Sequence, residues 1–316
     1  MRDAHYNGVM ATPQHPPEDT SDLWQAIDAS LSAALGIPFS IQGKIAVSGG
    51  CISETLRLDG QGVSVFIKLG RAADAAMFAA EANALTELAR TDTVRVPTVI
   101  AQGIAADRAW LAMEYIQPGQ TTAAAAARLG EQLAALHFYA QSGFGWHRNN
   151  WIGTTVQCNT PEQDWPTFFA RHRLQAQLDI AIGNALPQSV FERGYRLAEN
   201  VPALLGNYAP LPSLLHGDLW GGNWACDEHG QPYLYDPASY IGDRDADLAM
   251  TELFGGFPDS FYRAYDAVLP RAAGYPLRRE LYNLYHVLNH FNLFGAGYAM
   301  QAQAIIDKLL GETGGR

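Results

Sequence analysis

The feature that most constrains this chain is the fixed spacing of three oxygen-bearing side chains in its second half. Asp218 and Asn223 stand five residues apart in the glycine-rich segment 214–223. Asp236 follows thirteen residues after Asn223, at the end of the apolar stretch 232–236. Both segments are predicted to be short buried strands that end in loops. This arrangement is expected to place the Asp236 carboxylate near the Asp218 carboxylate.

The spacing of Asp218 and Asn223 matches the kinase catalytic loop, H-R-D-x-x-x-x-N. In that loop the Asp accepts the proton of the substrate hydroxyl and the Asn ligates Mg²⁺. A further carboxylate holds the metal between the β- and γ-phosphates of ATP, and Asp236 fits that place. Mg²⁺ prefers hard oxygen ligands and takes only one or two groups from the protein. The pattern therefore indicates phosphoryl transfer from ATP, with Asp218 as catalytic base and Asn223 and Asp236 as Mg²⁺ ligands.

The N-terminal half supplies a lysine and a glutamate that suit the same chemistry. In the predicted strand 63–69, four aliphatic residues alternate along one face, so Lys68 points to the other face. The helix predicted over 74–90 carries Glu81 in a stripe that is otherwise apolar. A carboxylate there is costly unless a cation meets it. We therefore expect Lys68 to bind phosphate and to pair with Glu81, as the strand lysine of V-A-I-K does in kinases.

Two further segments are expected to contact the nucleotide. The run Met113-Glu114-Tyr115-Ile116 precedes Pro118-Gly119 and resembles a kinase hinge. There Met113 would border the adenine, while the Glu114 carbonyl and the Ile116 amide would hold its edge. The loop 48–53 lacks the G-x-G-x-x-G pattern of kinases. Its expected phosphate contacts are Gly49, Gly50 and the hydroxyl of Ser53.

The order of predicted elements indicates an α+β, two-lobed, protein-kinase-like fold. A helix over 22–35 precedes three strands, the helix 74–90 and two more strands. The strands are predicted at 41–47, 54–58, 63–69, 98–103 and 110–116, with a turn at 59–62. Later segments are mainly helical, with helices predicted at 122–141 and 279–310. We expect a tail (1–20), an antiparallel β-rich nucleotide-binding N-lobe (21–117) and a larger, mainly helical catalytic and substrate C-lobe (118–316).

Composition narrows the class of protein. Hydrophobic residues make up 48% of the chain and charged residues 17%, which excludes extensive disorder. The net charge of −11 disfavours nucleic acid and anionic membranes as partners. The three cysteines are an odd number without a C-x-x-C pair, so a reducing compartment is expected. No secretory signal or membrane-spanning run is found. We expect a cytoplasmic enzyme, a monomer or weak homodimer, with no nucleic-acid or membrane partner.

The chain resembles the fructosamine kinase (ketosamine 3-kinase) family, within the aminoglycoside phosphotransferase-like branch of the protein-kinase-like fold. The segments that carry this resemblance are His216–Asn223, Asp236–Tyr240 with Gly242–Arg244, Asp247–Phe257, Leu288–His290, Asn150–Gly153, and Asp164-Trp165 with Phe168-Phe169. The resemblance implies ATP-dependent phosphorylation of the C3 hydroxyl of a ketosamine, a sugar–amine adduct formed by glycation. The 3-phosphate then leaves by elimination and frees the amine. The resemblance also implies that Trp220 and His290 border the sugar.

Other interpretations stay open at this stage. A kinase of the same fold that acts on an aminoglycoside, choline or an amino alcohol is the nearest, and a nucleotide-binding pseudokinase is another. Instead of bordering the sugar, Trp220 could be a core aromatic residue. His290 could instead form its hydrogen bonds with partners inside the protein. His137 is predicted to be a core histidine with internal partners. Cys51, in the expected phosphate loop, is a hypothetical oxidation-sensitive thiol.

Overall fold

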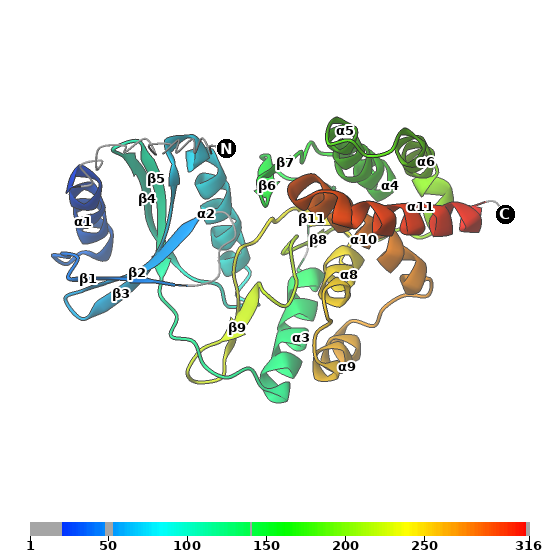
Figure 1. The fold of residues 1–316 in the computed structure, drawn as a ribbon. Coiled ribbons are helices and arrows are strands. Elements are labelled where there is room, and N and C mark those ends of the chain that lie inside the picture. Colours follow the sequence, from blue (N-terminus) through cyan, green and yellow to red (C-terminus); the bar gives the residue numbers. More distant parts are fainter. Residues whose placement is uncertain (1–20, 48–52, 140, 314–316) are drawn as a thin grey trace, which may run out of the picture.

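The fold was analysed in a computed structural model, which describes residues 21–47, 53–139 and 141–313. Figure 1 shows two lobes side by side, with the sheet and its two helices in one and most helices in the other. The N-lobe contains α1 (Ser21–Leu35), β1 (Gly43–Ala46), β2 (Glu54–Gly60), β3 (Val63–Arg71), the 3₁₀ turn η1 (Ala72–Asp74), α2 (Ala75–Arg90), β4 (Val99–Ala105) and β5 (Arg108–Glu114).

The N-lobe sheet is antiparallel, with strand order β1-β2-β3-β5-β4. Helices α1 and α2 lie on opposite faces of this sheet (Figure 1). The buried aliphatic row of β3 packs against α1 in one core cluster, which includes Val65, Ile67, Leu69, Leu23 and Ile27. Because side chains alternate along a strand, Lys68 faces the α2 side. The predicted order of three strands, one helix and two strands is confirmed.

The C-lobe is built around α10 and is mainly helical. Its elements are α3 (Ala123–Phe138), β6 (Asn150–Ile152), β7 (Thr155–Gln157), α4 (Trp165–Phe169), the π-helical turn η2 (Ala170–Gln175), α5 (Ala176–Gly183), α6 (Gln188–Glu199), α7 (Val201–Leu205), β8 (Ser213–Leu214), β9 (Trp224–Cys226), β10 (Pro232–Leu234), β11 (Ile241–Gly242), α8 (Asp245–Leu253), α9 (Asp259–Val268), α10 (Tyr275–Phe294), the 3₁₀ turn η3 (Ala296–Tyr298) and α11 (Ala299–Thr313). Helix α8 packs on α10, and α3 packs along α9.

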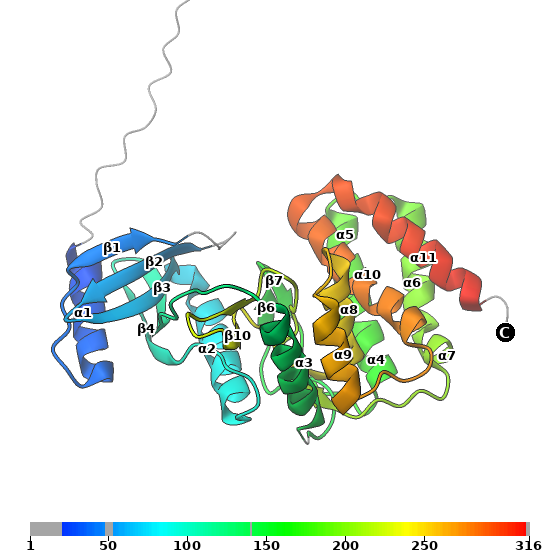
Figure 2. The same ribbon diagram turned by 90° about the horizontal axis from the view of Figure 1, so that it is seen from below.

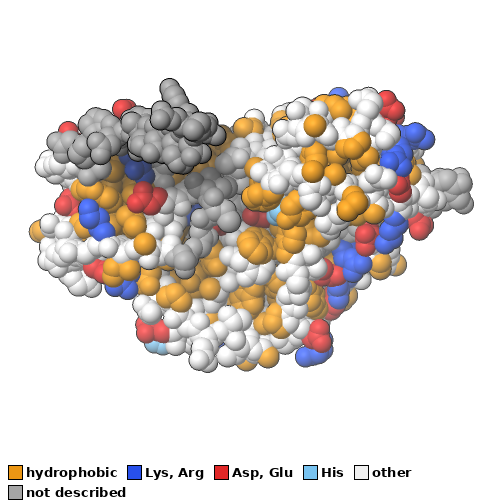
Figure 3. Space-filling model, viewed as in Figure 1, with side chains coloured by type: hydrophobic (Ala, Val, Ile, Leu, Met, Phe, Trp, Pro, Cys, Tyr) orange, Lys and Arg blue, Asp and Glu red, His pale blue; other side chains and the backbone are white. Residues whose placement is uncertain are grey.

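Short hairpins lie where the two lobes meet. Strand β9 pairs with β10, and β6 pairs with β7, both antiparallel. The view turned by 90° in Figure 2 shows β6, β7 and β10 between α2 of one lobe and the helical body of the other. On the face drawn in Figure 3, outside the grey residues, basic and acidic side chains are interspersed rather than gathered into one basic patch. No helix in the described ranges combines the length and apolar character that crossing a bilayer requires.

Several sequence-based boundaries were wrong, and three of these differences concern the fold or the loop that carries Asp218. The helix predicted at 279–310 is two helices, because Gly295 adopts φ +88° after α10 and a 3₁₀ turn precedes α11. The strand predicted at 214–223 ends at Leu214, since the following residues form the loop that carries Asp218. The turn predicted at 59–62 is shorter, because β2 continues to Gly60 and only two residues separate it from β3.

Candidate active site

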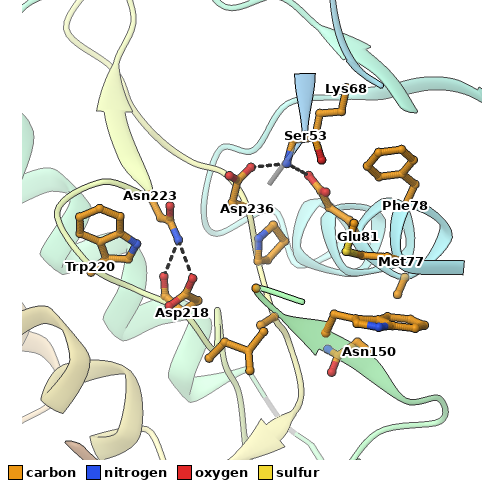
Figure 4. Close-up of a pocket in the computed structure, with 16 residues that line it drawn as sticks. Ser53, Lys68, Met77, Phe78, Glu81, Asn150, Asp218, Trp220, Asn223 and Asp236 are labelled. Carbon is orange, nitrogen blue, oxygen red and sulfur yellow. Dashed lines mark hydrogen bonds and ion pairs between the residues drawn. The ribbon is translucent and has the colours of Figure 1, made fainter. Parts of the chain in front are cut away.

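A cleft between the lobes gathers most of the polar side chains singled out in the sequence. It is lined from the N-lobe by Ser53 and by residues of β3 and α2, and from the C-lobe by the loop before β9, the residues after β10, and β6. The predicted site residues that line it are Ser53, Lys68, Glu81, Asp218, Trp220, Asn223 and Asp236. Figure 4 shows Lys68 between Glu81 and Asp236, with Asp218 and Asn223 across the cleft.

Lys68 is held between two carboxylates from different lobes. Its Nζ lies 2.6 Å from Glu81 Oε1 and 2.6 Å from Asp236 Oδ1, and the residue is 9% exposed. Burial alone would lower the pKa of Lys68, but Asp236 and Glu81 together raise that pKa above its usual value. Burial raises the pKa of Glu81, and Lys68 opposes the shift. The ammonium group is therefore charged at neutral pH and lies at the lining of the cleft.

Asp218 and Asn223 form the second cluster of the cleft. The Asn223 side-chain Nδ2 donates to the Asp218 backbone oxygen at 2.8 Å and to its carboxylate Oδ2 at 3.1 Å. Burial, followed by the nearby negative charge of Asp236, raises the pKa of Asp218 to about 7. A carboxyl group with such a pKa can accept a proton at neutral pH, which is the property a general base needs.

A buried carboxylate on α8, Asp247, holds the backbone of the loop that carries Asp218. Its oxygens accept hydrogen bonds from the backbone N–H of His216 at 2.7 Å and of Gly217 at 2.8 Å. The His137 Nε2 lies 3.2 Å from the same carboxylate, and its Nδ1 lies 2.9 Å from the Tyr265 hydroxyl. The prediction that His137 is a core histidine with internal partners is confirmed. Sequence reasoning gave Asp247 no role beyond a family segment.

Gly217 is required by the path of this loop. Its φ is +85°, in the left-handed region that glycine adopts without strain. A Cβ atom at this position would lie 2.1 Å from the carbonyl oxygen of Ala238, a distance no side chain tolerates. The loop therefore passes directly against the chain that follows Asp236, which brings the two carboxylates to the same cleft.

The oxygen donors of the cleft fit a Mg²⁺ ion. Within residues 21–47, 53–139 and 141–313, no group of three or more His, Cys, Asp and Glu side chains forms a self-sufficient metal site. Mg²⁺ needs fewer protein ligands, because waters and phosphate oxygens complete its shell. Asn223 bonds to Asp218 through its Nδ2 group, which leaves its amide oxygen as a ligand alongside the Asp236 carboxylate. Asp236 has φ +56°, a conformation that Asp tolerates better than most residues.

Trp220 and His290 occupy different places. Trp220 lines the cleft and is 38% exposed, so it is not a core aromatic. Its ring meets Phe254 edge-on, with centroids 6.3 Å apart. His290 does not line the cleft: its Nδ1 donates to the His286 carbonyl at 2.8 Å and its ring packs against Phe254, with centroids 4.6 Å apart. Burial lowers the pKa of His290. The internal bond that the sequence left open for His290 is therefore present.

The expected hinge lies outside the lining of the cleft. Met113 and Ile116 are buried, while the Glu114 carboxylate accepts a hydrogen bond from Arg95 at 3.0 Å. Arg95 also forms an ion pair with Asp227 of the C-lobe. This contact between the lobes was missed in the sequence, because nothing local marks it. Gly49, Gly50 and Cys51 lie outside the described residues.

Comparisons with known proteins point to one family. The family model described as fructosamine kinase matches residues 23–312. A relative from Synechocystis named as a ketoamine kinase is 44% identical over 298 residues, covering 93% of this chain and 99% of the relative. The chloroplastic protein-ribulosamine 3-kinase of Arabidopsis thaliana is 40% identical and covers 84% of this chain and 82% of its own.

Two solved structures have a fold similar to that of this chain. A Haemophilus somnus crystal structure named as a fructosamine-3-kinase superposes with a TM-score of 0.85 at 28% identity, covering 91% of this chain and 97% of that one. The aminoglycoside phosphotransferase APH(4)-Ia superposes with a TM-score of 0.59 at 15% identity, covering 92% and 99% of the two chains. At that identity the second likeness concerns the fold alone.

Replacing Lys68 with Met should make stability strongly dependent on pH. Without the ammonium group, the buried Glu81 carboxylate loses its cation and keeps the nearby negative charge of Asp236, so the folded-state pKa of Glu81 rises above the unfolded one. Stability is then lost as pH rises, because the folded Glu81 carboxyl group must ionise. Removing one partner of a buried pair costs about 3–5 kcal/mol. We expect thermal unfolding to show a larger loss for Lys68→Met at pH 8 than at pH 5.5.

Lys44→Met is the matched control for this experiment. Lys44 is an exposed cation of β1 whose Nζ lies 3.9 Å from the centre of the Trp24 ring. Its removal leaves no buried carboxylate unpaired, so a small loss without pH dependence is expected. An equal loss at both pH values for Lys68→Met would contradict the role given to the ion pairs.

Proposed function

The chain belongs to the fructosamine kinase family, and from this premise we propose that it transfers the γ-phosphoryl group of ATP to the 3-hydroxyl of a ketosamine. A ketosamine is the sugar adduct left on an amine by glycation. Elimination of the 3-phosphate then releases the amine, so the reaction promotes deglycation. The observation that carries the proposal is the family match over residues 23–312, within which Lys68, Glu81, Asp218, Asn223 and Asp236 meet in one cleft.

Asp218 is proposed as the catalytic base. Its carboxylate is oriented by the Nδ2 group of Asn223 at 3.1 Å, and Asp247 fixes the backbone just before it. The raised pKa of Asp218, about 7, matches it to a hydroxyl donor at neutral pH. The proton of the 3-hydroxyl passes to the Asp218 carboxylate as the oxygen bonds to the γ-phosphorus and the bond to the β-phosphate oxygen breaks.

Lys68 is proposed to bind the phosphates of ATP while Glu81 keeps its ammonium group in place. Asn223 and Asp236 would hold Mg²⁺, which neutralises phosphate charge in reactions of this kind. The Ser53 hydroxyl, with Gly49 and Gly50, is proposed to contact the phosphates. Because the reaction needs little covalent chemistry from the protein, positioning and charge neutralisation supply most of the rate.

The adenine is assigned to the hinge, beyond the lining of the cleft, and the sugar to the part of the cleft beside Trp220. We propose that the Glu114 carbonyl and the Ile116 amide hold the adenine edge, beside Met113. The exposed ring of Trp220 is proposed to stack on the apolar face of the sugar. His290 and Trp220 both pack against Phe254, so the proposed effect of His290 on the sugar passes through these rings.

The cellular setting is also a proposal. The odd number of cysteines and the net charge of −11 support a reducing compartment and a partner that is not nucleic acid or an anionic membrane. We propose that the protein acts in the cytoplasm as a monomer or weak homodimer. The amine it releases would belong to a small molecule or to a protein.

A panel of acceptors tests the proposed reaction. ATP consumption is measured with Mg²⁺ and a ribulosamine, a fructosamine, a free pentose, choline or an aminoglycoside. We expect preferential turnover of a ketosamine, and a loss of roughly 10²–10⁴-fold in Asp218→Asn, because the variant lacks the proton acceptor but keeps the volume. Asp259→Asn, an exposed change of the same kind at the start of α9, should leave the rate unchanged.

Each other outcome of the panel has a definite meaning. Turnover of choline or the aminoglycoside in preference to both ketosamines would overturn the substrate assignment and keep the kinase chemistry. Binding of ATP without turnover of any acceptor would favour a pseudokinase. A loss below tenfold in Asp218→Asn would contradict the role of Asp218 as base.

The rate of the same reaction should depend on pH in one direction. A protonated Asp218 cannot accept the substrate proton, so kcat/KM should fall as the pH drops below about 7 and level off above it. The measurement is a pH profile of kcat/KM for the ketosamine between pH 5.5 and 8.5, with ATP affinity followed in parallel. A flat profile over this range would contradict the assignment.

A further inference from the structure

Helix α2 is contacted by a hairpin that belongs to the other lobe. Strand β6 of the β6–β7 hairpin packs against α2, and Figure 2 shows the hairpin between α2 and the C-lobe helices. The position of the helix that carries the glutamate matters in kinases, because the lysine–glutamate pair must be in place for transfer. The contact between β6 and α2 can therefore affect the distance between Lys68 and Glu81.

Two polar contacts reach α2 from the segment just before β6. Arg148 donates from its guanidinium to the carbonyl oxygen of Ala79 at 3.2 Å, and Trp146 Nε1 donates to Asn83 Oδ1 at 3.4 Å. Ala79 and Asn83 stand two residues before and two residues after Glu81. The two contacts with α2 therefore lie on either side of Glu81, the residue that pairs with Lys68.

The base of the hairpin is fixed to the chain that carries Asp236. Asn150 Nδ2 donates to the Ser239 carbonyl at 2.7 Å, and Gln157 Nε2 donates to the Ala238 carbonyl at 3.1 Å. These two carbonyls lie only two and three residues after Asp236. Asn150 and Gln157 are both buried and also bond to each other at 2.8 Å.

A buried polar network ties this base to α10 and η2: Asn159 donates to Asn150 Oδ1 at 2.8 Å and accepts from Arg173. The Tyr285 hydroxyl of α10 donates to Gln157 Oε1 at 2.6 Å. The Arg173 guanidinium, 0% exposed, donates to Asn159 Oδ1 at 2.7 Å and lies 3.9 Å from the centre of the Tyr240 ring. Each of these buried bonds resists rearrangement, because displacing it leaves a donor or acceptor unpaired, although Arg173 Nε has no hydrogen-bond partner.

We propose that the β6–β7 hairpin, with Trp146 and Arg148, is a clamp that fixes α2 to the Asp236 segment. It sets the separation of Glu81 and Asp236, the two carboxylates that hold Lys68. Through it the chain keeps α2 in the position for transfer without a separate activating partner. The inference rests on the proposed kinase function only for its effect on turnover. Trp146 and Arg148 act as positioning residues.

The first test removes the hydrogen bond from Arg148 to α2 and measures the local stability of α2. In Arg148→Ala, hydrogen exchange of the α2 amides and the Kd of a fluorescent ATP analogue with Mg²⁺ are measured. We expect faster exchange in α2 but not in α10, and about tenfold weaker nucleotide binding, the size expected when a hydrogen bond from a charged donor is lost. The KM for the ketosamine should change less than twofold, because that site lies on the C-lobe.

Three further variants separate positioning from folding. Arg148→Lys keeps a cationic donor and should restore most of the nucleotide affinity. Asn83→Ala removes the acceptor of Trp146 and should raise α2 exchange in the same way. Arg171→Ala, which breaks a surface ion pair of the C-lobe with Glu162, should change neither measurement. Exchange that rises equally in α2 and α10 of Arg148→Ala would indicate general destabilisation and overturn the proposal.

A double-mutant cycle asks whether the clamp acts through Glu81. In a Glu81→Gln background, Arg148→Ala should weaken nucleotide binding less than twofold further, since the residue it positions is already altered. An equal effect in both backgrounds, or unchanged exchange and affinity in Arg148→Ala alone, would overturn the proposal. If the wild-type protein turned over no acceptor, the proposed function would fail, whereas these binding and exchange measurements would still decide the clamp.

Discussion

The rest of the cleft depends on one buried cation held between two lobes. Lys68 belongs to β3, Glu81 to α2, and Asp236 to the chain that follows β10, so a single ammonium group joins three elements at 2.6 Å contacts. Burying a charge is costly unless its partners are in place. This requirement fixes which face of β3 meets α2 and leaves the opposite, aliphatic face to pack against α1. The position of α2 therefore depends on these ion pairs as well as on hydrophobic packing.

Two carboxylates near the catalytic loop have opposite roles because their surroundings differ. Burial and the charge of Asp236 raise the pKa of Asp218 to about 7. Asp247 is more deeply buried, which alone would raise its pKa, but its hydrogen bond and electrostatic interaction with His137, followed by the interaction with His216, lower that pKa below the usual value. The lowered pKa of Asp247 favours the ionised carboxylate that accepts hydrogen bonds from the loop backbone, whereas Asp218 has a pKa at which it can exchange a proton near neutral pH. Such separation of environments is how one fold provides a structural and a reactive carboxylate.

The sequence predicted the fold class and seven of the residues that line the cleft, because these have local signals. Strand alternation gave the direction of Lys68, the cost of a carboxylate in an apolar stripe gave its pairing with Glu81, and the five-residue spacing gave Asp218 with Asn223. Contacts between distant parts of the chain leave no local pattern, so the sequence did not predict them. Examples are the ion pair of Arg95 with Asp227 and the hydrogen bond from Arg148 to α2. The helix break at Gly295 was missed because apolar residues continue on both sides of it.

The most direct test of the account is a crystal structure with Mg²⁺, a non-hydrolysable ATP analogue and a ketosamine bound together. We predict that the 3-hydroxyl of the sugar lies about 2.6–3.2 Å from the Asp218 carboxylate, within reach of proton transfer. The γ-phosphate should lie beside Lys68, with Glu81 still bonded to its ammonium group. A sugar whose 3-hydroxyl is directed away from Asp218, or phosphates bound away from Lys68, would contradict the account.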